Sequence, residues 1–286
     1  MIRIAIPNKG RLHDPAVQLF KDAGLPILTG SSRKLFAKTV DPDITILFAR
    51  AADIPEYVKD GAADVGITGL DMIAECRAEV EELLDLGFGA ANLVLAVPDD
   101  SEIKTAEDLK GKRVATELPE ITKKFFDERG IDIKIVQVSG ACELTPHIGI
   151  ADAIVDISSS GTTLLLNSLR VIDQVFESSV YLIANPESIK NNEKILSIKT
   201  ALESVLNAKD RRYLMMNVPS DVLPAVEKLL PGMNGPTVME VESKEGKSML
   251  AVHAVIDADK IFSTVHELKK VGARDILVVP IERIIP

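Results

Sequence analysis

The chain has 286 residues, 46% of them hydrophobic and 27% charged, which is the composition of a soluble globular protein with about two domains. Its net charge of −10 argues against nucleic acid or an anionic membrane as a partner, because both bind basic faces, but a phosphate-bearing substrate needs only a few Arg or Lys side chains and backbone N–H groups. The two cysteines and four histidines are scattered, so the sequence predicts neither a disulfide nor a zinc site.

Strands and helices alternate through the first 90 residues. Apolar runs predict strands at residues 2–7, 44–48 and 65–68, and helical patterns follow at 15–23, 53–61 and 70–82. The helix at 53–61 begins with Asp53 as its N-cap, has Pro55 in its first turn and ends at Gly61. This alternation predicts a parallel sheet with helices on both faces.

A second α/β run begins near residue 91. Its predicted strands are 93–97, 113–116, 134–138, 153–157 and 179–184, and its predicted helices are 121–129, 144–150 and 163–169, besides a short capped helix from Thr105. A loop at 185–192 and a helix at 193–206 then return the chain to the first domain. We therefore predict two α/β lobes, the first formed by residues 1–90 plus 185–208 and the second by residues 91–184.

The last segment, residues 209–286, changes character and predicts a third domain. Strands are expected at 212–218, 238–242, 249–256 and 276–281, with helices at 220–230 and 260–271. The order β-α-β-β-α-β is that of a ferredoxin-like (ACT-like) α+β domain.

The stretch that carries chemistry spans residues 151–167. An apolar strand delivers Asp152 and Asp156, a bend rich in hydroxyl groups follows, and a helix opens directly after it. Gly161 permits an unusual turn and close approach of a ligand. The side chains that can donate hydroxyl hydrogen bonds are Ser158, Ser159, Ser160, Thr162 and Thr163. With the free N–H groups of the helix start, they would cradle a phosphate monoester, and Asp156 would accept hydrogen bonds from ribose hydroxyls. The alternative is a simple N-capping turn.

This stretch is similar to the phosphoribosyl-pyrophosphate (PRPP) loop of ATP phosphoribosyltransferases. It is not a Walker A loop, since it has no Gly-Lys-Ser/Thr. Six further segments resemble motifs of the same family, and a seventh, LPGMNGPTV at 230–238, resembles the start of the regulatory segment of its long form. The six are PNKGRL at 7–12, ARAADIPEYV at 49–58, DVGITGLD at 64–71, LGFG at 86–89, ATELP at 115–119 and GACELTP at 140–146. The resemblance therefore runs from end to end.

The resemblance implies a two-lobed catalytic core like that of type II periplasmic binding proteins, with the active site between the lobes, and a C-terminal regulatory domain that binds histidine. It implies that N1 of ATP attacks PRPP with release of pyrophosphate, that Mg²⁺ is bound through substrate phosphates, and that histidine inhibits this first step of histidine biosynthesis. A homo-oligomer, a hexamer or a dimer, is expected. The start of the chain does not read as a signal peptide and no apolar run approaches about 20 residues, so we expect a cytoplasmic enzyme.

Cationic side chains follow two strands of the first lobe. Lys9, Gly10 and Arg11 form a polar turn after the first strand, at the edge where open α/β sheets bind ligands. Arg50 follows another strand, and its planar guanidinium suits a bidentate phosphate contact. They could neutralise triphosphate or pyrophosphate, or be solvated turn residues and a surface ion pair. Asp71, after the Gly69 turn, could orient a ligand or cap a helix.

Three further sets of residues are candidates, and the first two have open alternatives. Glu117 and Glu143 each follow a strand of the second lobe and could hold Mg²⁺ or the adenine amino group, or lie on the surface. Arg33 could reach a phosphate or be a solvated loop charge. In the tail, Asn217 and Thr237 are the expected contacts of the regulatory histidine.

Three other functions compete with this interpretation. A non-enzymatic solute-binding protein would share the two-lobed fold, but it would need an export signal. A phosphoribosyltransferase for another base would share the phosphate cradle, but not the end-to-end set of motifs. A purely regulatory module would explain the tail and leave about 200 preceding residues without a role.

Overall fold

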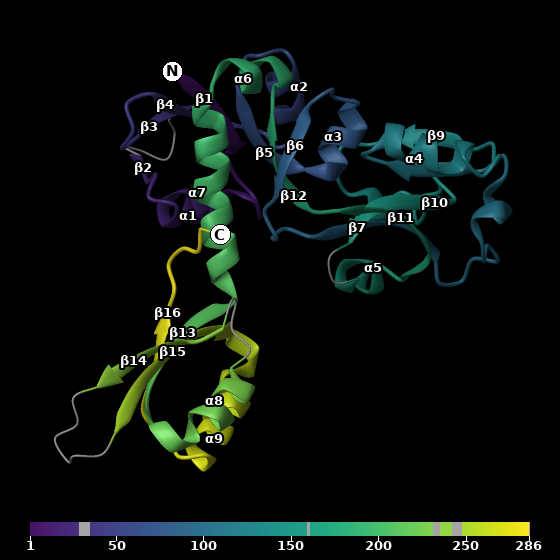
Figure 1. Cartoon of the computed structure of the whole chain (residues 1–286). Helices are drawn as coiled ribbons and strands as arrows, with labels where there is room; N and C mark the ends of the chain where they lie inside the picture. The colour runs from purple at the N-terminus through teal and green to yellow at the C-terminus, as the bar shows by residue number, and fades with distance from the viewer. Residues whose placement is uncertain (29–34, 159–160, 231–234, 242–247, 286) are drawn as a thin grey trace. The chain divides into compact units, whose positions relative to one another are not determined.

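The computed structural model describes residues 1–28, 35–158, 161–230, 235–241 and 248–285. The chain divides into two compact units, Met1–Lys199 and Thr200–Pro286. The first unit contains two sheets and the second contains one (Figure 1). No helix in the described ranges is long and apolar enough to cross a bilayer.

The first lobe is built on a seven-stranded sheet in the order β2-β3-β4-β1-β5-β12-β6. Neighbouring strands β1, β4 and β5 are parallel, and β12 is antiparallel to β5 and β6. Every residue of β5 is buried, as expected where helices cover both faces of a sheet. The strands are β1 Ile2–Pro7, β2 Ile27–Leu28, β3 Phe36–Thr39, β4 Ile44–Ala49, β5 Val65–Gly69, β6 Glu81–Asp85 and β12 Val180–Ala184; the helices are α1 His13–Asp22, α2 Ile54–Lys59, α3 Leu70–Cys76 and α6 Pro186–Asn191.

The second lobe is built on a five-stranded sheet in the order β11-β7-β10-β8-β9. Strands β8, β9 and β10 run parallel, while β7 is antiparallel to both of its neighbours. An aliphatic core with two phenylalanines fills the space between this sheet and α4. The strands are β7 Ala91–Pro98, β8 Arg113–Thr116, β9 Lys134–Gln137, β10 Ala153–Ser158 and β11 Leu169–Ser178; the helices are α4 Pro119–Asp127 and α5 Thr162–Leu166.

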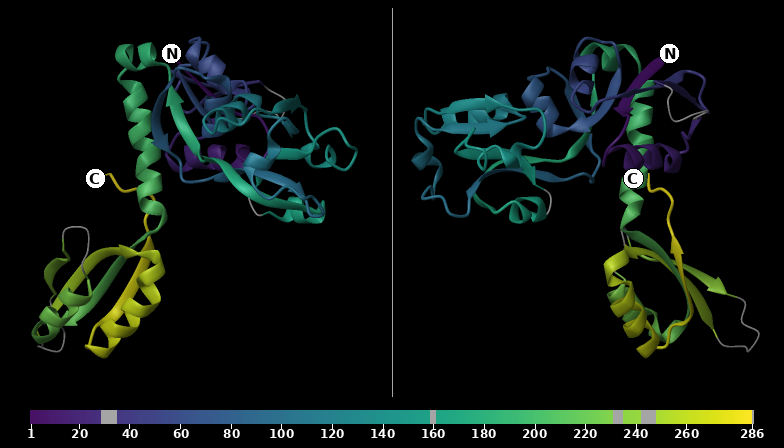
Figure 2. Two further views of the ribbon diagram at one scale, coloured as in Figure 1. Left: turned by 90° about the vertical axis from the view of Figure 1, so that its right-hand side faces the viewer. Right: turned by 180° about the vertical axis from the view of Figure 1, so that it is seen from behind.

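The two lobes are joined by two passes of the chain, residues 86–90 and residue 179 (Figure 2). At the second pass, Ser178 pairs with Ala91 in the second sheet, whereas Val180 pairs with Gly69 in the first. The carboxyl end of β10 also reaches this point, because Ser158 pairs with Asn92. The carboxyl edges of both sheets therefore meet at the crossover, and the residues that follow those strands are brought together there.

Several elements differ from the sequence prediction. Residues 179–184 were assigned to the second lobe, but β12 pairs with β5 and β6 of the first. The helix predicted at 70–82 ends at Cys76, because Arg77 adopts a left-handed conformation (φ 50°), and 81–85 forms β6 instead. The helix predicted to end at residue 169 stops at Leu166, and β11 begins at 169. Only a 3₁₀ turn, Cys142–Leu144, forms where a helix was predicted at 144–150.

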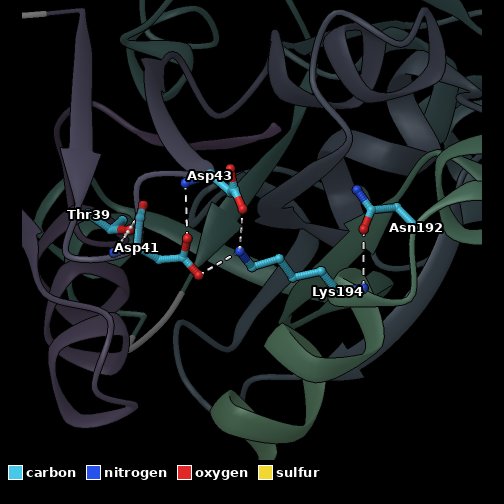
Figure 3. Close-up of polar contacts among 5 residues, drawn as sticks. All are labelled: Thr39, Asp41, Asp43, Asn192 and Lys194. Carbon is cyan, nitrogen blue, oxygen red and sulfur yellow. Dashed lines mark hydrogen bonds and ion pairs between the residues drawn. The ribbon is translucent and has the colours of Figure 1, made fainter.

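Helix α7, Lys194–Lys209, leaves the first lobe from a fixed starting point. The ammonium group of Lys194 lies 2.7 Å from the carboxylate of Asp41 and 3.2 Å from that of Asp43, both in the turn between β3 and β4 (Figure 3). The hydrogen bond from Lys194 lowers the pKa of Asp41. The side chain of Asn192 accepts a hydrogen bond from the Lys194 backbone N–H. The first turn of α7 is thus tied to the first lobe by charge and by a cap.

The C-terminal unit has the predicted β-α-β-β-α-β order, and its sheet runs β14-β15-β13-β16. One face of the sheet is covered by α8 and α9 (Figure 1). Its buried side chains alternate along β13 and β15 with half-buried ones, which is the pattern of a sheet whose second face is less covered than the first. The elements are β13 Arg211–Pro219, α8 Leu223–Leu229, β14 Thr237–Val241, β15 Met249–Asp257, α9 Ile261–Lys270 and β16 Arg274–Pro280.

Candidate active site

The hydroxyl-rich bend lies at the carboxyl end of β10, where it turns into α5. Gly161 has φ 72°, and its backbone N–H donates to the hydroxyl of Ser158 over 3.0 Å. A Cβ added to Gly161 would meet nothing within 4 Å, so glycine is needed here for the backbone conformation and not for space. Thr162 and Thr163 are exposed at the start of α5. Ser159 and Ser160 lie outside the described residues.

Asp156 lies on β10, two residues before the end of the strand. Its carboxylate accepts a hydrogen bond of 2.7 Å from the backbone N–H of Ile157. Burial, together with the nearby carboxylates of Glu143 and Glu117, raises the pKa of Asp156 to about 6. This carboxyl group therefore changes its charge close to neutral pH, as many groups in active sites do.

The carboxylates of Glu117 and Glu143 gather beside Asp156 because β8, β9 and β10 are parallel neighbours whose carboxyl ends share one edge. Glu117 directly follows β8, and Glu143 lies in the 3₁₀ turn after β9. Burial, reinforced by these three carboxylates, raises the pKa of the Cys142 thiol to about 12, so Cys142 is an inert buried thiol. Within the part of the chain that the structure describes, no three His, Cys, Asp or Glu side chains converge as a metal site.

The structure does not bring Asp152 to the bend. Asp152 precedes the amino end of β10, six residues before Ser158, and a strand of that length spans about 20 Å. Its carboxylate accepts hydrogen bonds from the Arg113 backbone N–H over 2.8 Å and from the Arg113 guanidinium over 3.2 Å. The hydrogen bond from the Arg113 side chain lowers the pKa of Asp152. The geometry ties this residue to the amino end of β8.

The cationic residues of the first lobe share one sheet edge. Strands β1 and β4 are parallel neighbours, with Pro7 paired to Ala49, and the Asn8 N–H donates to the Ala49 carbonyl over 2.7 Å. The Lys9–Arg11 turn, in which Gly10 has φ 80°, and Arg50 therefore follow adjacent strand ends, and their side chains are exposed. Arg33 lies outside the described residues.

Asp71 neither caps α3 nor lies free at the surface. It is 5% exposed, and its carboxylate accepts a hydrogen bond of 2.8 Å from the hydroxyl of Ser178, which in turn accepts from the Asp71 N–H. A Cβ added to Gly69 would lie 2.0 Å from the Asp71 carboxylate, so glycine is required there for space. Ser178 is the last residue of the second lobe before the crossover. No local sequence pattern indicates this pair, because its members are 107 residues apart.

The predicted regulatory residues lie on one sheet of the C-terminal unit. Asn217, on β13, donates from its amide to the carboxylate of Asp275 over 2.9 Å. Thr237 is exposed at the start of the edge strand β14 and pairs with His253 on β15. Because β15 lies between β14 and β13, the two candidates are two strands apart.

Known proteins that are similar to this chain identify its family. The family described as ATP phosphoribosyltransferase matches residues 50–204, and the HisG C-terminal domain matches residues 208–283. The ATP phosphoribosyltransferase of Methanosarcina barkeri is 70% identical over the whole of both chains, and that of Methanocella arvoryzae is 57% identical, again over both whole chains.

The chain belongs to the ATP phosphoribosyltransferase family. With both the catalytic and the C-terminal domain in one chain, it is a long-form ATP phosphoribosyltransferase, a phosphoribosyl-transferring enzyme of histidine biosynthesis.

The fold of the family supports the same assignment. The structure of the ATP phosphoribosyl transferase (HisG:HisZ) complex from Thermotoga maritima contains a chain that is 30% identical, with a TM-score of 0.64, over 71% of this chain and 97% of that one. In this ATP phosphoribosyltransferase, the carboxyl edges that carry the first-lobe cations and the second-lobe carboxylates meet at a single crossover.

Proposed function

We propose that the chain transfers the 5-phosphoribosyl group of PRPP to N1 of ATP, giving N1-(5-phosphoribosyl)-ATP and pyrophosphate. The observation that carries the proposal is the strand register at the crossover, where Gly69 pairs with Val180 and Ala91 pairs with Ser178. Because of this register, cations from one lobe and hydroxyl and carboxylate groups from the other approach one place. A reaction between two phosphorylated substrates needs both kinds of group.

The second lobe would bind the sugar donor. The backbone N–H groups and hydroxyls of the bend around Gly161 would hold the 5′-phosphate. Asp156, in its ionised form, would accept hydrogen bonds from the ribose hydroxyls. The left-handed φ of Gly161 and the position of Asp156 two residues before Ser158 support this assignment.

The first lobe would bind the phosphates of ATP and the departing pyrophosphate. Lys9, Arg11 and Arg50 supply positive charge where negative charge grows as the bond from C1 to pyrophosphate breaks. Attack by N1 from the opposite side inverts the configuration at C1, so no covalent enzyme intermediate is needed. Aligning the two substrates contributes up to roughly 7–11 kcal/mol in favourable cases.

Mg²⁺ is proposed as the metal, bound mainly through substrate phosphates. Because no three acidic side chains of the described residues converge as a metal site, the substrate phosphates would supply most of the ligands, and a single carboxylate such as Glu117 or Glu143 would add an oxygen donor of the kind that Mg²⁺ prefers. When bound, the ion neutralises charge on the pyrophosphate. Glu117 and Glu143 could alternatively hold the adenine amino group.

We further propose that histidine binds the C-terminal unit near Asn217 and Thr237 and lowers activity in a cytoplasmic homo-oligomer, a hexamer or a dimer. Feedback requires a coupling free energy between two sites, usually about 1–3 kcal/mol. The proposal is supported by the HisG C-terminal domain and by the placement of both residues on one sheet.

One assay tests the proposed reaction. The purified chain is incubated with ATP, PRPP and Mg²⁺ while pyrophosphate release is followed, and ATP is then replaced by adenine or by orotate. Release with ATP alone is expected. Release with orotate or adenine and none with ATP would instead indicate a phosphoribosyltransferase for another base. Unchanged initial rates in millimolar histidine would contradict the regulatory part.

A further inference from the structure

Helix α3 is shared by the cores of both lobes. It follows β5 of the first lobe, and its residues Leu70 and Ile73 pack into the first-lobe core. Met72 and Ala74 of the same helix pack against the core of the second lobe. The helix has only seven residues, so no part of it is far from either lobe.

The end of α3 also makes polar contacts with α4 of the second lobe. The carboxylate of Glu75 accepts hydrogen bonds of 3.1 Å from the backbone N–H groups of Glu120 and Ile121. These are first-turn N–H groups, which have no partner within their own helix. Leu118, the N-cap of α4, has an apolar side chain and offers no cap. Arg77 forms an ion pair with the side chain of Glu120. A carboxylate from one lobe thus caps a helix of the other.

The capped turn is adjacent to the candidate site. Glu117 lies between the end of β8 and Pro119, the first residue of α4. Leu118 is buried, and its N–H donates to the Thr116 hydroxyl over 3.0 Å. The segment that carries Glu117 is therefore fixed at one end by β8 and at the other by the turn that Glu75 caps.

Both ends of α3 consequently hold the second lobe. Near its amino end, Asp71 accepts a hydrogen bond from Ser178 at the crossover. Near its carboxyl end, Glu75 and Arg77 contact α4. Contacts at two separated points restrict rotation of one lobe against the other, whereas the crossover alone would act as a simple pivot.

We propose that Glu75 and Arg77 form an interlobe clamp that holds the Glu117 edge of the second lobe in register with the cations of the first, which makes them positioning residues for the reaction. This inference rests on the proposed function. Under that function each substrate would contact both edges, since PRPP has its ribose on the second lobe and its pyrophosphate on the first, and ATP has its phosphates on the first lobe and its adenine facing the second. Loss of the clamp lowers the fraction of molecules with the lobes in register and raises the apparent dissociation constants of ATP and PRPP by a common factor.

The kinetic test compares Glu75→Ala, Glu75→Gln and the control Glu79→Gln, which removes the same charge from an exposed position four residues further on. For Glu75→Ala we expect KM for ATP and KM for PRPP to rise together by roughly five- to twentyfold, with kcat changed less than about twofold. Glu75→Gln keeps an oxygen acceptor and should recover part of the loss. Glu79→Gln should behave as the unsubstituted chain.

A second pair of variants tests the ion pair. Arg77→Met and Glu120→Gln should each raise both KM values, and the double variant should be little worse than either single one, since both remove the same contact. An additive loss in the double variant would contradict the Arg77–Glu120 part of the clamp.

Hydrogen–deuterium exchange supplies a readout that needs no activity. In Glu75→Ala, amides at the start of α4 should exchange about tenfold faster than in Glu79→Gln, although residue 75 lies in the other lobe. Unchanged exchange there, a rise in only one KM, or a lower melting temperature with both KM values intact would overturn the clamp. If the unsubstituted chain released no pyrophosphate, the proposed function would fail, and the exchange result would still decide whether the clamp exists.

Discussion

The two sheet edges that meet at the crossover carry opposite charge. The first-lobe edge presents Lys9, Arg11 and Arg50, all exposed and cationic. The second-lobe edge presents the carboxylates of Asp156, Glu117 and Glu143, whose mutual repulsion adds to burial in raising the pKa of Asp156. Exposed cations suit mobile, strongly charged phosphates, whereas the half-buried carboxylate of Asp156 suits the neutral hydroxyl groups of a sugar that must be held at one angle. Under the proposed function, recognition of the two substrates is divided between the lobes, so neither edge is sufficient alone.

The strongest way to break this division is Gly161→Val. The bend requires φ 72°, which a β-branched residue adopts only at a cost, so the backbone donors should turn away from the donor phosphate. We expect turnover to fall at least about a hundredfold in the pyrophosphate assay. Gly111→Val is a matched control in the same lobe, since Gly111 has φ 76° and open space as well. Equal activity losses in both variants would point to general strain and against the bend.

Asp156→Asn should have the next largest effect. Because the ionised carboxylate is the proposed acceptor for the ribose hydroxyls, kcat/KM of the unsubstituted chain should rise as pH increases through about 6. The variant should be about a hundredfold less active at pH 8 and lack this step in its pH profile. A step near pH 6 that persists in Asp156→Asn would assign the titration to another group.

The same substitution should stabilise the fold. Folding raises the pKa of Asp156 from 3.8 to about 6, so the neutral carboxyl group favours the folded chain; that contribution is complete below about pH 4 and is lost as pH rises through 6. Asparagine stays neutral at every pH. At pH 8 we expect the free energy of unfolding of Asp156→Asn to be higher by about 1 kcal/mol, after allowance for partial exposure. Chemical denaturation at pH 4 and pH 8 measures it, and the gain should vanish at pH 4.

Arg50→Gln tests the cationic edge. We expect kcat/KM to fall about tenfold and to depend less on salt, because an exposed cation acts on phosphates through a screened field. Arg50→Lys should recover part of the activity and Lys21→Gln, on an exposed position of α1, should change nothing. A salt dependence that is identical in Arg50→Gln and the unsubstituted chain would remove Arg50 from the phosphate site.

We expect the smallest effect for Asp152→Asn, because Asp152 lies outside the second-lobe edge. Asp152 is tied to Arg113 at the far end of β10, so pyrophosphate release should stay within about twofold of the unsubstituted rate. Stability should fall by at most about 1 kcal/mol at pH 7, because this ion pair is partly exposed. A large loss of activity with an unchanged melting temperature would return Asp152 to the donor site.

The sequence predicted the strands that have a clear apolar pattern and missed strands whose pattern is interrupted by charged residues. Strands β1, β5 and β10 are apolar runs, and the sequence predicted them. In β6 and β11, apolar residues alternate irregularly with charged ones, and the sequence predicted neither strand. Strand β11 pairs with β7, which lies 71 to 87 residues earlier, from Leu169 with Pro98 to Ser178 with Ala91, through two register shifts. Such a strand is defined by its distant partner and not by its own composition.

The residues of the candidate site also differ in how well the sequence predicted their positions. Residues that directly follow a strand, such as Arg50 and Glu117, were placed at the correct sheet edge from the sequence, because parallel strands share a carboxyl edge. The contacts between the two lobes were not predicted from the sequence. Asp71 with Ser178 and Glu75 with α4 join residues 107 and 45 positions apart, and neither has a local pattern.

The pairing of Ala91 with Ser178 makes the second lobe an insert within the first. The two ends of that insert leave from neighbouring strands, about 5 Å apart. Residues 91–178 therefore form a module with adjoining termini, which a short linker would close into a circular permutant or an independent piece. Transplanting this module between relatives would exchange the half of the enzyme that is proposed to bind the sugar donor and leave in place the half that carries Lys9, Arg11 and Arg50.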